Sequence, residues 1–202
     1  MTKGEITRNR IISEAAPLFN KHGFDGCSMQ EISVATGLEK ASLYGHFATK
    51  EELAGEAFRY AWKQSCSARM GNLGDVANSV DKLKLHIENL ASKQAFPGGC
   101  PLWNTATDTD DGNSVLRSMA KEALRDWISA LNQIIEEGQS KGEIGADVDP
   151  EGLSTLIISL MEGAFITSQL QESGRVLRVA QQHLNAYIES QVRTRPQANE
   201  TL

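Results

Sequence analysis

The sequence predicts an all-α protein, with a small N-terminal three-helix unit that contains a helix-turn-helix and a larger C-terminal helical domain. Apolar residues recur at three- and four-residue spacing along much of the 202-residue chain, and no stretch alternates convincingly as a strand does. Near the N-terminus, two short helical patterns are separated only by "TGL" and are preceded by a longer helix. That arrangement is typical of a helix-turn-helix.

The composition is that of an ordinary globular protein, with 40% hydrophobic and 23% charged residues. The N-terminal "MTKGEITRNRII" has no apolar core, so we expect no secretory signal. The longest strongly apolar stretch, residues 153–165, is too short to span a bilayer and contains Glu162. We therefore expect a soluble, cytoplasmic protein.

Charge is distributed unevenly along the chain. Residues 1–50 hold six Lys or Arg against five Asp or Glu, a net charge of +1, within a chain whose formal net charge is −6. The rest of the chain is acidic and would repel nucleic acid. Any nucleic-acid contact should therefore lie in the first quarter of the sequence.

Residues that carry catalysis or bind metals are not arranged in any recognisable pattern. Cys27, Cys66 and Cys100 are odd in number and widely spaced, and the four histidines are equally scattered. This argues against a disulfide framework and against zinc ligands. Phosphate-binding loops and nucleophile motifs are also missing. We expect no catalytic residues, no metal and no cofactor, and hence no enzyme.

The first helix carries its apolar residues on one face and has Gly23 as a plausible stop, although Pro17 lies inside it. The next helix begins after Ser28, which has Glu31 three residues later in the spacing of a capping box, and it ends at Gly37. A third helix follows almost at once. Thr49, with Glu52, caps a fourth.

Residues 38–47 form a helix with small residues in the middle of one face. At 100° per residue, Leu43 and Phe47 point inward, and the opposite face presents three small side chains. Longer donors flank this face. Small residues let a helix enter the major groove while longer side chains reach phosphates. The alternative is a solvated amphipathic helix, which the neighbouring helices and the turn make less favourable. The residues of the outer face and its flanks are Lys40, Ala41, Ser42, Tyr44, Gly45 and His46.

Residues 8–55, and above all "MQEISVATGLEKASLYGHFATKEEL", resemble the TetR family of bacterial transcriptional repressors. The signature runs from an Ile-containing helix through an Ala-x-Gly turn to Ser-Leu-Tyr-x-His-Phe and Lys-Glu-Glu-Leu. Glu39, Ala41 and Gly45 depart from residues common in that family, which alters the expected operator sequence. The resemblance implies that the residues in contact with DNA are Ser28, Lys40, Ser42, Tyr44, His46 and Lys50.

The remaining chain is expected to fold as further amphipathic helices, interrupted near residues 70–75 and by a loop at 95–101. We expect Asp149 to be the N-cap of a long helix and Pro150 to be its first residue. We divide the chain into a DNA-binding domain (1–50), an effector-binding and dimerisation domain (51–192) and a flexible tail (193–202).

The last two long helices, about 150–171 and 174–192, carry broad apolar faces. Periodicity alone leaves open whether these faces form the core of the chain or an interface. The resemblance implies that they pair with a second copy in a two-fold four-helix bundle. We expect a homodimer whose interface includes Leu153, Leu156, Ile157, Leu160, Phe165, Leu177, Leu184 and Tyr187.

Two features suggest how a signal could act. Five aromatic residues are candidates for lining a cavity for an unknown small-molecule effector, although ordinary core packing explains them as well. Cys100 precedes Pro101 at an expected helix start, where unpaired amides favour a thiolate, and a Gly-Cys pair here resembles a family subgroup that senses electrophiles or oxidants. Burial as a small packing residue is the alternative for Cys100. The aromatic residues are Trp62, Phe96, Trp103, Trp127 and Phe165.

These observations predict a dimeric, DNA-binding transcriptional repressor whose operator affinity falls in response to a small molecule or an electrophile. An all-α enzyme on the same fold and a DNA-binding protein without an effector are the alternatives.

Overall fold

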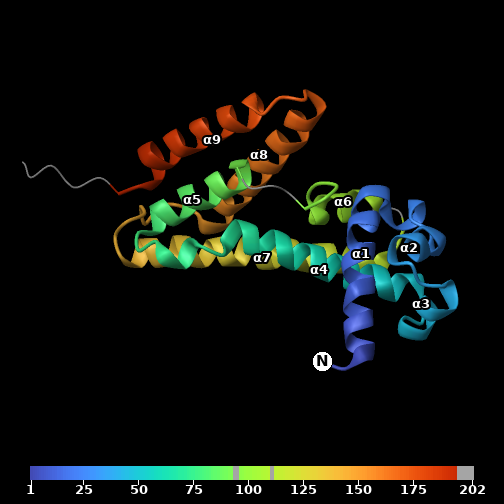
Figure 1. Cartoon of the computed structure of the whole chain (residues 1–202). Helices are drawn as coiled ribbons and strands as arrows, with labels where there is room; N and C mark the ends of the chain where they lie inside the picture. The colour runs from blue at the N-terminus through green and yellow to red at the C-terminus, as the bar shows by residue number, and fades with distance from the viewer. Residues whose placement is uncertain (93–95, 110–111, 195–202) are drawn as a thin grey trace, which may run out of the picture. The chain divides into compact units, whose positions relative to one another are not determined.

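The computed structural model describes residues 1–92, 96–109 and 112–194 (Figure 1). Its regular structure is helical, and the described residues contain no strand. The predicted all-α class is therefore confirmed. The helices are α1 (Lys3–Gly26), α2 (Met29–Thr36), α3 (Lys40–His46), α4 (Lys50–Met70), α5 (Ser79–Ser92), α6 (Pro101–Asp108), α7 (Ser114–Ser140), α8 (Pro150–Leu170) and α9 (Arg175–Tyr187), with a 3₁₀ turn at Leu73–Asp75 and a π turn at Ile188–Val192.

Internal contacts divide the chain into two compact units. The first unit comprises residues 1–68 and 94–125, and the second comprises 69–93 and 126–202. Two of the three boundaries fall inside α4 and α7, and the third falls after α5. The predicted functional division after residue 50 stays a prediction. Most of the predicted tail, residues 195–202, lies outside the described residues.

Helix α1 begins earlier than its apolar pattern indicates and is interrupted at Gly23, before its end at Gly26. Thr2 accepts from the Glu5 amide, and the Glu5 carboxylate accepts from the Thr2 amide, forming a capping box. Gly23 has φ 74° and ψ 176°, so the helical path breaks there. Pro17 is accommodated inside the helix.

The core of the first unit holds α2 and α3 against α1. Its buried side chains come from all four N-terminal helices, with Ile11 and Ile32 completely buried beside Leu43 and Phe47. A second group, Ala16, Ala57 and Ala61, lets α1 and α4 approach closely. Burying side chains of this size contributes roughly 1.5–3 kcal/mol each, so the position of α3 is set mainly by packing.

The second unit is built on α8 and α9, which pack side by side (Figure 1) and against α5. The Arg193 guanidinium donates to Asp81 and Glu189, and this ties the end of the described chain to α5 and to the π turn. The fully or almost fully buried aliphatic side chains of this unit are Leu83, Ile87, Leu131, Ile135, Ile144, Ile157, Ile158, Leu184 and Ile188.

Helix α8 is 21 residues long and, among the described residues, is the one helix apolar enough to cross a membrane by length and composition. The apolar stretch 153–165 lies inside this longer helix, so its own length does not exclude a membrane span. Core helices of globular proteins pass the same test. One side of α8 is buried among α5 and α9, while Leu156, Leu160 and Leu170 are exposed.

Candidate functional site

Helix α2 starts at a capping box whose N-cap residue, Ser28, is exposed. The Ser28 hydroxyl accepts from the Glu31 amide at 3.2 Å, and the Ser28 amide donates to the Glu31 carboxylate at 2.7 Å. The bond from the Ser28 amide lowers the pKa of Glu31, and a side-chain hydrogen bond from Ser28 lowers it further, so Glu31 stays ionised. Ser28 itself is exposed.

The turn between α2 and α3 is short and rigid. Gly37 ends α2 in the left-handed conformation, with φ 65°, where a side chain would be strained. The Ser33 hydroxyl donates to the Leu38 carbonyl at 2.6 Å, which fixes the residue after the glycine. The predicted helix-turn-helix, Ser28–Phe47, is thus present with the expected cap and turn.

The outer face of α3 is open, as the helical wheel predicts. Leu43 and Phe47 are buried, whereas Lys40, Ala41 and Gly45 are exposed and the Tyr44 side chain is 51% exposed. Ser42 and His46 are half-buried. A Cβ added at Gly45 would have no neighbour within 4 Å. Packing within the described chain therefore does not require this glycine.

Two basic residues near the helix-turn-helix lie over aromatic rings. Arg8 on α1 places its guanidinium 4.5 Å from the centre of the Phe47 ring and pairs with Glu52 and Glu56. These pairs are partly exposed and worth little individually. Lys50 begins α4, and its Nζ lies 4.4 Å from the centre of the Phe24 ring. Thr49 accepts from the Glu52 amide, as predicted for the cap of α4.

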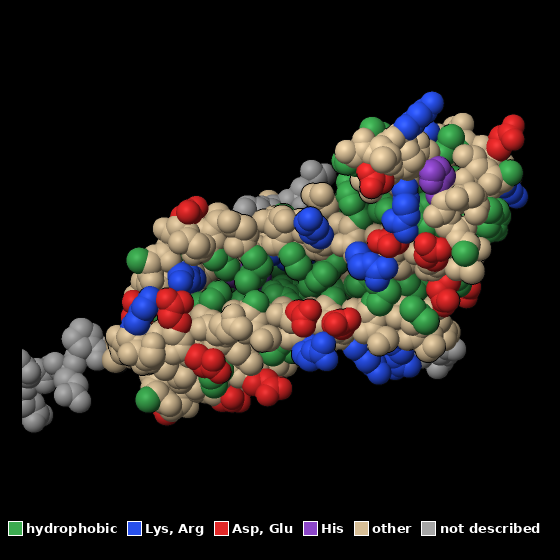
Figure 2. Space-filling view, turned by 90° about the horizontal axis from the view of Figure 1, so that it is seen from below, with side chains coloured by type: hydrophobic (Ala, Val, Ile, Leu, Met, Phe, Trp, Pro, Cys, Tyr) green, Lys and Arg blue, Asp and Glu red, His purple; other side chains and the backbone are tan. Residues whose placement is uncertain are grey.

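Figure 2 shows the face on which α3 and the N-terminal end of α1 lie. At that end of the molecule, basic side chains and a histidine are interspersed with acidic side chains. This agrees with the modest net charge of residues 1–50. Binding to a polyanion would therefore depend on a few well-placed donors rather than on a broad basic surface.

The three cysteines have different surroundings. Cys100 is the N-cap residue of α6, with Pro101 in the first turn, as predicted, and its side chain is 3% exposed. Cys27 is buried in the core around α2, and burial together with the nearby Glu31 carboxylate raises its pKa to about 11. Cys66 is half-buried. The burial of Cys100 is what the packing interpretation expects.

The five aromatic residues belong to different units. Trp62, Phe96 and Trp103 lie in the first unit, and Trp127 and Phe165 lie in the second. Phe96 meets Tyr60 edge-on at 6.4 Å between ring centres. Trp103 has a buried Nε1 with no hydrogen-bond partner among the described residues. Trp127 is buried and donates to His86 at 3.2 Å, so it acts as core in its unit.

A buried polar cluster in the second unit was missed by sequence reasoning. The Arg69 guanidinium pairs with the Glu162 carboxylate at 3.1 Å and lies 4.8 Å from the centre of the Trp127 ring. The Arg69 carbonyl accepts from Asn89 at 2.9 Å and lies 3.2 Å from His86 Nδ1. The one signal in the sequence was a glutamate within an apolar stretch, because buried charges need partners.

The apolar faces of α8 and α9 divide into buried and exposed residues. Leu153, Ile157 and Leu184 are buried in the chain's own core, which removes them from any surface interface. Phe165 and Leu177 are half-buried. Leu156, Leu160 and Tyr187 are exposed by 41%, 38% and 44% respectively. The sequence-based interface was therefore too wide, because one apolar stripe faces both the neighbouring helix and the solvent.

The comparisons with known proteins match both parts of the chain. Residues 11–57 match the family described as bacterial regulatory proteins of the tetR family, and residues 79–184 match the tetracyclin repressor-like C-terminal domain. A TetR transcriptional regulator from Chloroflexus aurantiacus has 36% identity and a TM-score of 0.92, covering 96% of this chain and all of that one. One from Cytophaga hutchinsonii has 29% identity and a TM-score of 0.91, covering 97% and 99% respectively.

The curated relatives are transcriptional regulators and not enzymes. The transcriptional repressor DhaR of a Mycobacterium species is 23% identical, and the match covers 82% of this chain and 84% of that protein. The regulator UidR of Escherichia coli is 26% identical, covering 89% and 90% respectively. The helix-turn-helix, the match over both domains and the close agreement of whole structures lead to one assignment: the chain belongs to the TetR family of DNA-binding transcriptional regulators.

Proposed function

We propose that this protein is a dimeric repressor that binds operator DNA through α3 and releases it in response to a chemical signal. The observation that carries the proposal is the outer face of α3, where small exposed residues are flanked by Lys40 and Tyr44 above a fully packed core. A helix of this form fits the major groove. The name of DhaR, a repressor, favours repression over activation.

The proposed role of each residue follows from the length of its side chain. Ala41 and Gly45 allow α3 to approach the base edges, and Ser42 donates or accepts there. Lys40, Tyr44 and His46 reach toward the flanking phosphates, together with Ser28 at the start of α2. Lys50 adds a cation at the first residue of α4, where backbone amides also favour an anion.

The dimer would form through the exposed side of α8 and α9, within the effector-binding and dimerisation domain expected at residues 51–192. Leu156, Leu160 and Tyr187 are exposed apolar side chains on these helices. Covering them with a second copy removes apolar area from water. A dimer also presents two copies of α3 to two half-sites, which raises affinity for an operator.

The signal would reach the protein in the cytoplasm, as a small molecule or an electrophile. Trp103 offers a buried N–H donor that nothing in the described chain uses, and Phe96 lies half-buried near Tyr60. A ligand that supplies an acceptor to Trp103 would satisfy this group. Trp62, in the same unit, remains a candidate for lining such a site, whereas Trp127 and Phe165 belong to the second unit. Cys100 is the residue on which an electrophile would act.

Selection of bound DNA from a random pool would first supply the operator and its half-site spacing. Tyr44→Ala and Lys50→Ala should each weaken binding to that operator by roughly 1–3 kcal/mol, because each removes a hydrogen bond to charged phosphate. Lys50→Ala should also reduce the slope of log affinity against log salt by about one. Fluorescence anisotropy at several salt concentrations measures both quantities.

Lys63→Ala is the matched control, because Lys63 is an exposed lysine further along α4. Its removal should leave both affinity and slope unchanged. Normal operator binding by the Tyr44→Ala, Lys50→Ala double variant would disprove the assignment of α3. A protein that binds DNA but is neither stabilised nor released by any small molecule would support the effector-free alternative.

A further inference from the structure

The helical path of α1 is broken at Gly23, shortly before the chain passes to α2. Its φ of 74° is a conformation that side chains strongly disfavour, and the next residue, Phe24, presents its backbone N–H outward from the end of the helix. Everything that follows, from Ser28 to Phe47, is the helix-turn-helix. The geometry at Gly23 and Phe24 therefore helps to set where α3 lies.

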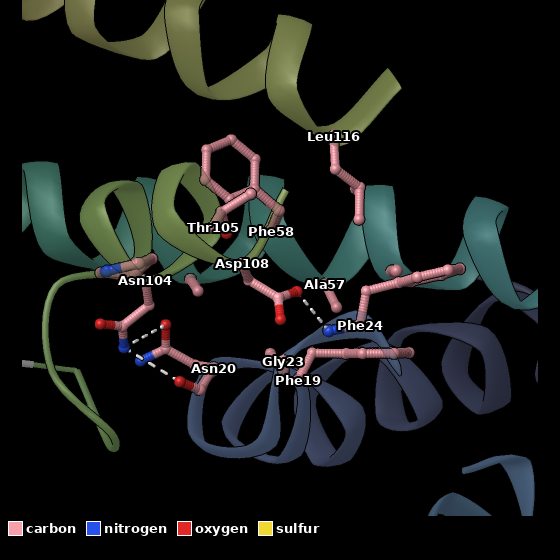
Figure 3. Close-up of a pocket in the computed structure, with 14 residues that line it drawn as sticks. Phe19, Asn20, Gly23, Phe24, Ala57, Phe58, Asn104, Thr105, Asp108 and Leu116 are labelled. Atoms are coloured by element: carbon pink, nitrogen blue, oxygen red, sulfur yellow. Dashed lines mark hydrogen bonds between the residues drawn. The ribbon is translucent and has the colours of Figure 1, made fainter. Parts of the chain in front are cut away.

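The Phe24 amide is hydrogen-bonded to an acidic residue that lies far away in the sequence. Asp108, at the end of α6, accepts from the Phe24 amide with a distance of 2.6 Å to its Oδ2 (Figure 3). A Cβ added at Gly23 would overlap the Asp108 carboxylate. Gly23 is thus required both by its backbone conformation and by the closeness of α6. Short bonds from an amide to an ionised carboxylate are among the stronger hydrogen bonds in proteins.

A second tie joins the same two helices one turn earlier. Asn104 on α6 lies within hydrogen-bond distance of the Asn20 carbonyl, at 2.9 Å, and of the Gly98 carbonyl, at 2.8 Å. Asn20 in turn donates to the Pro97 and Gly99 carbonyls. Figure 3 shows both asparagines and Asp108 along the line where α1 meets α6. The loop before α6, α6 itself and the end of α1 are therefore linked by polar bonds.

A small cavity lies beside these bonds and is lined by Phe19, Phe24, Phe58 and Leu116, among other residues. Its volume of about 30 Å³ is room for a few water molecules at most, and far below that of a pocket for a drug-sized ligand. We therefore do not assign the effector to it. Asp108 is one of the residues that line it.

We propose that Asp108 is a positioning residue for DNA binding: its bond to the Phe24 amide fixes the orientation of the helix-turn-helix relative to α6. The proposal rests on the DNA binding of α3 and goes beyond it by naming the residue outside the helix-turn-helix that holds α3 in place. Without this bond, the N-terminal helices, still packed on one another, sample other orientations relative to α6. The population with α3 in the binding orientation then falls, and operator affinity falls in proportion.

The test compares Asp108→Ala with Asp108→Asn. The alanine variant removes the acceptor and should lower operator affinity by roughly tenfold, which is the scale of one hydrogen bond to a charged group. The asparagine variant keeps an acceptor oxygen and should restore most of the affinity. Hydrogen exchange at the Phe24 amide should speed up in the alanine variant and return toward the native rate in the asparagine variant.

Thr107→Ala is the matched control, because Thr107 is exposed and, among the described residues, its hydroxyl bonds within α6, to the Trp103 and Asn104 carbonyls. It should bind like the native protein. Binding to DNA of unrelated sequence, measured at low salt, separates positioning from unfolding: a positioning role lowers operator binding and spares non-specific binding. Thermal unfolding confirms that each variant is folded at the binding temperature.

Unchanged operator affinity in a folded Asp108→Ala variant overturns the proposal. So does an equal loss of operator and non-specific binding, which would mark a general structural role. If the native protein itself selects no DNA, the proposed function fails instead, and the two failures are therefore distinguishable.

Discussion

At the scale of single residues, His86 shows how burial fixes a protonation state. Its Nε2 accepts from Trp127, so its Nδ1 carries the proton and donates to the Arg69 carbonyl. Both ring nitrogens are thus used by the neutral form. Desolvation, together with the nearby Arg69 charge, lowers the pKa of His86 from 6.5 to about 4.

This shift predicts a loss of stability on mild acidification. The unfolded chain binds a proton to His86 below its ordinary pKa, while the folded chain resists protonation until about pH 4. Stability from this residue is therefore complete above pH 6.5 and is lost as the pH falls toward 4, by about 2 kcal/mol at pH 5. Urea unfolding between pH 5 and 7.5 measures the slope. His86→Gln should flatten it and lower stability at pH 7.5.

His183→Gln is the comparison, because His183 is exposed and its removal should leave the slope as it is. An unchanged slope in His86→Gln would mean that other groups cause the acid sensitivity.

At the scale of secondary-structure elements, α6 lies between the Cys100 thiol and the hydrogen bond that Asp108 makes to Phe24. Its N-cap, Cys100, is buried, and the loop before it is bonded to Asn20 on α1. The same short helix ends at Asp108, which bonds to Phe24. A change at the start of α6 is therefore well placed to disturb the contacts that orient the helix-turn-helix.

Alkylation of Cys100 should accordingly release the operator, because an added group does not fit at a residue that is 3% exposed and must displace the start of α6. Mass spectrometry after treatment with N-ethylmaleimide locates the modified cysteine, and anisotropy measures bound DNA. Cys100→Ser should bind DNA and lose this response.

Cys66→Ser should retain the response, since Cys66 is the half-buried thiol outside this region. Cys27 should react slowest of the three, because burial raises its pKa to about 11. DNA that stays bound after complete modification of Cys100 would show that the thiol only packs.

At the scale of the whole molecule, the question is which apolar surface is shared with a second copy. Helices α8 and α9 bury one side against each other and leave Leu156, Leu160 and Tyr187 exposed. A single helix-turn-helix reads few base pairs, so two must act together for tight operator binding.

Replacing both Leu156 and Leu160 with Glu should give a folded monomer, because the charges would be buried unpaired in the dimer but exposed in the monomer. Sedimentation at micromolar concentration reports the state. Operator affinity should fall by roughly a hundredfold or more with the loss of two-site binding.

Val115→Glu, at an exposed apolar residue on α7, should remain a dimer. A native protein that sediments as a folded monomer at micromolar concentration would contradict the interface. Charges at Leu184 are not a useful test, because that residue is buried within the chain and its replacement would unfold the protein.

Local features were decided by the sequence alone. The cap at Ser28, the left-handed Gly37, the small outer face of α3 and the start of α8 at Pro150 all follow from neighbouring residues, because caps, turns and helical periodicity depend on positions a few residues apart. Tertiary structure decided which members of a broad apolar stripe are core, burying Ile157 beside exposed Leu156. It also paired Asp108 with Phe24 and Arg69 with Glu162, partners more than eighty residues apart, whose meeting depends on how helices pack and which no local pattern encodes.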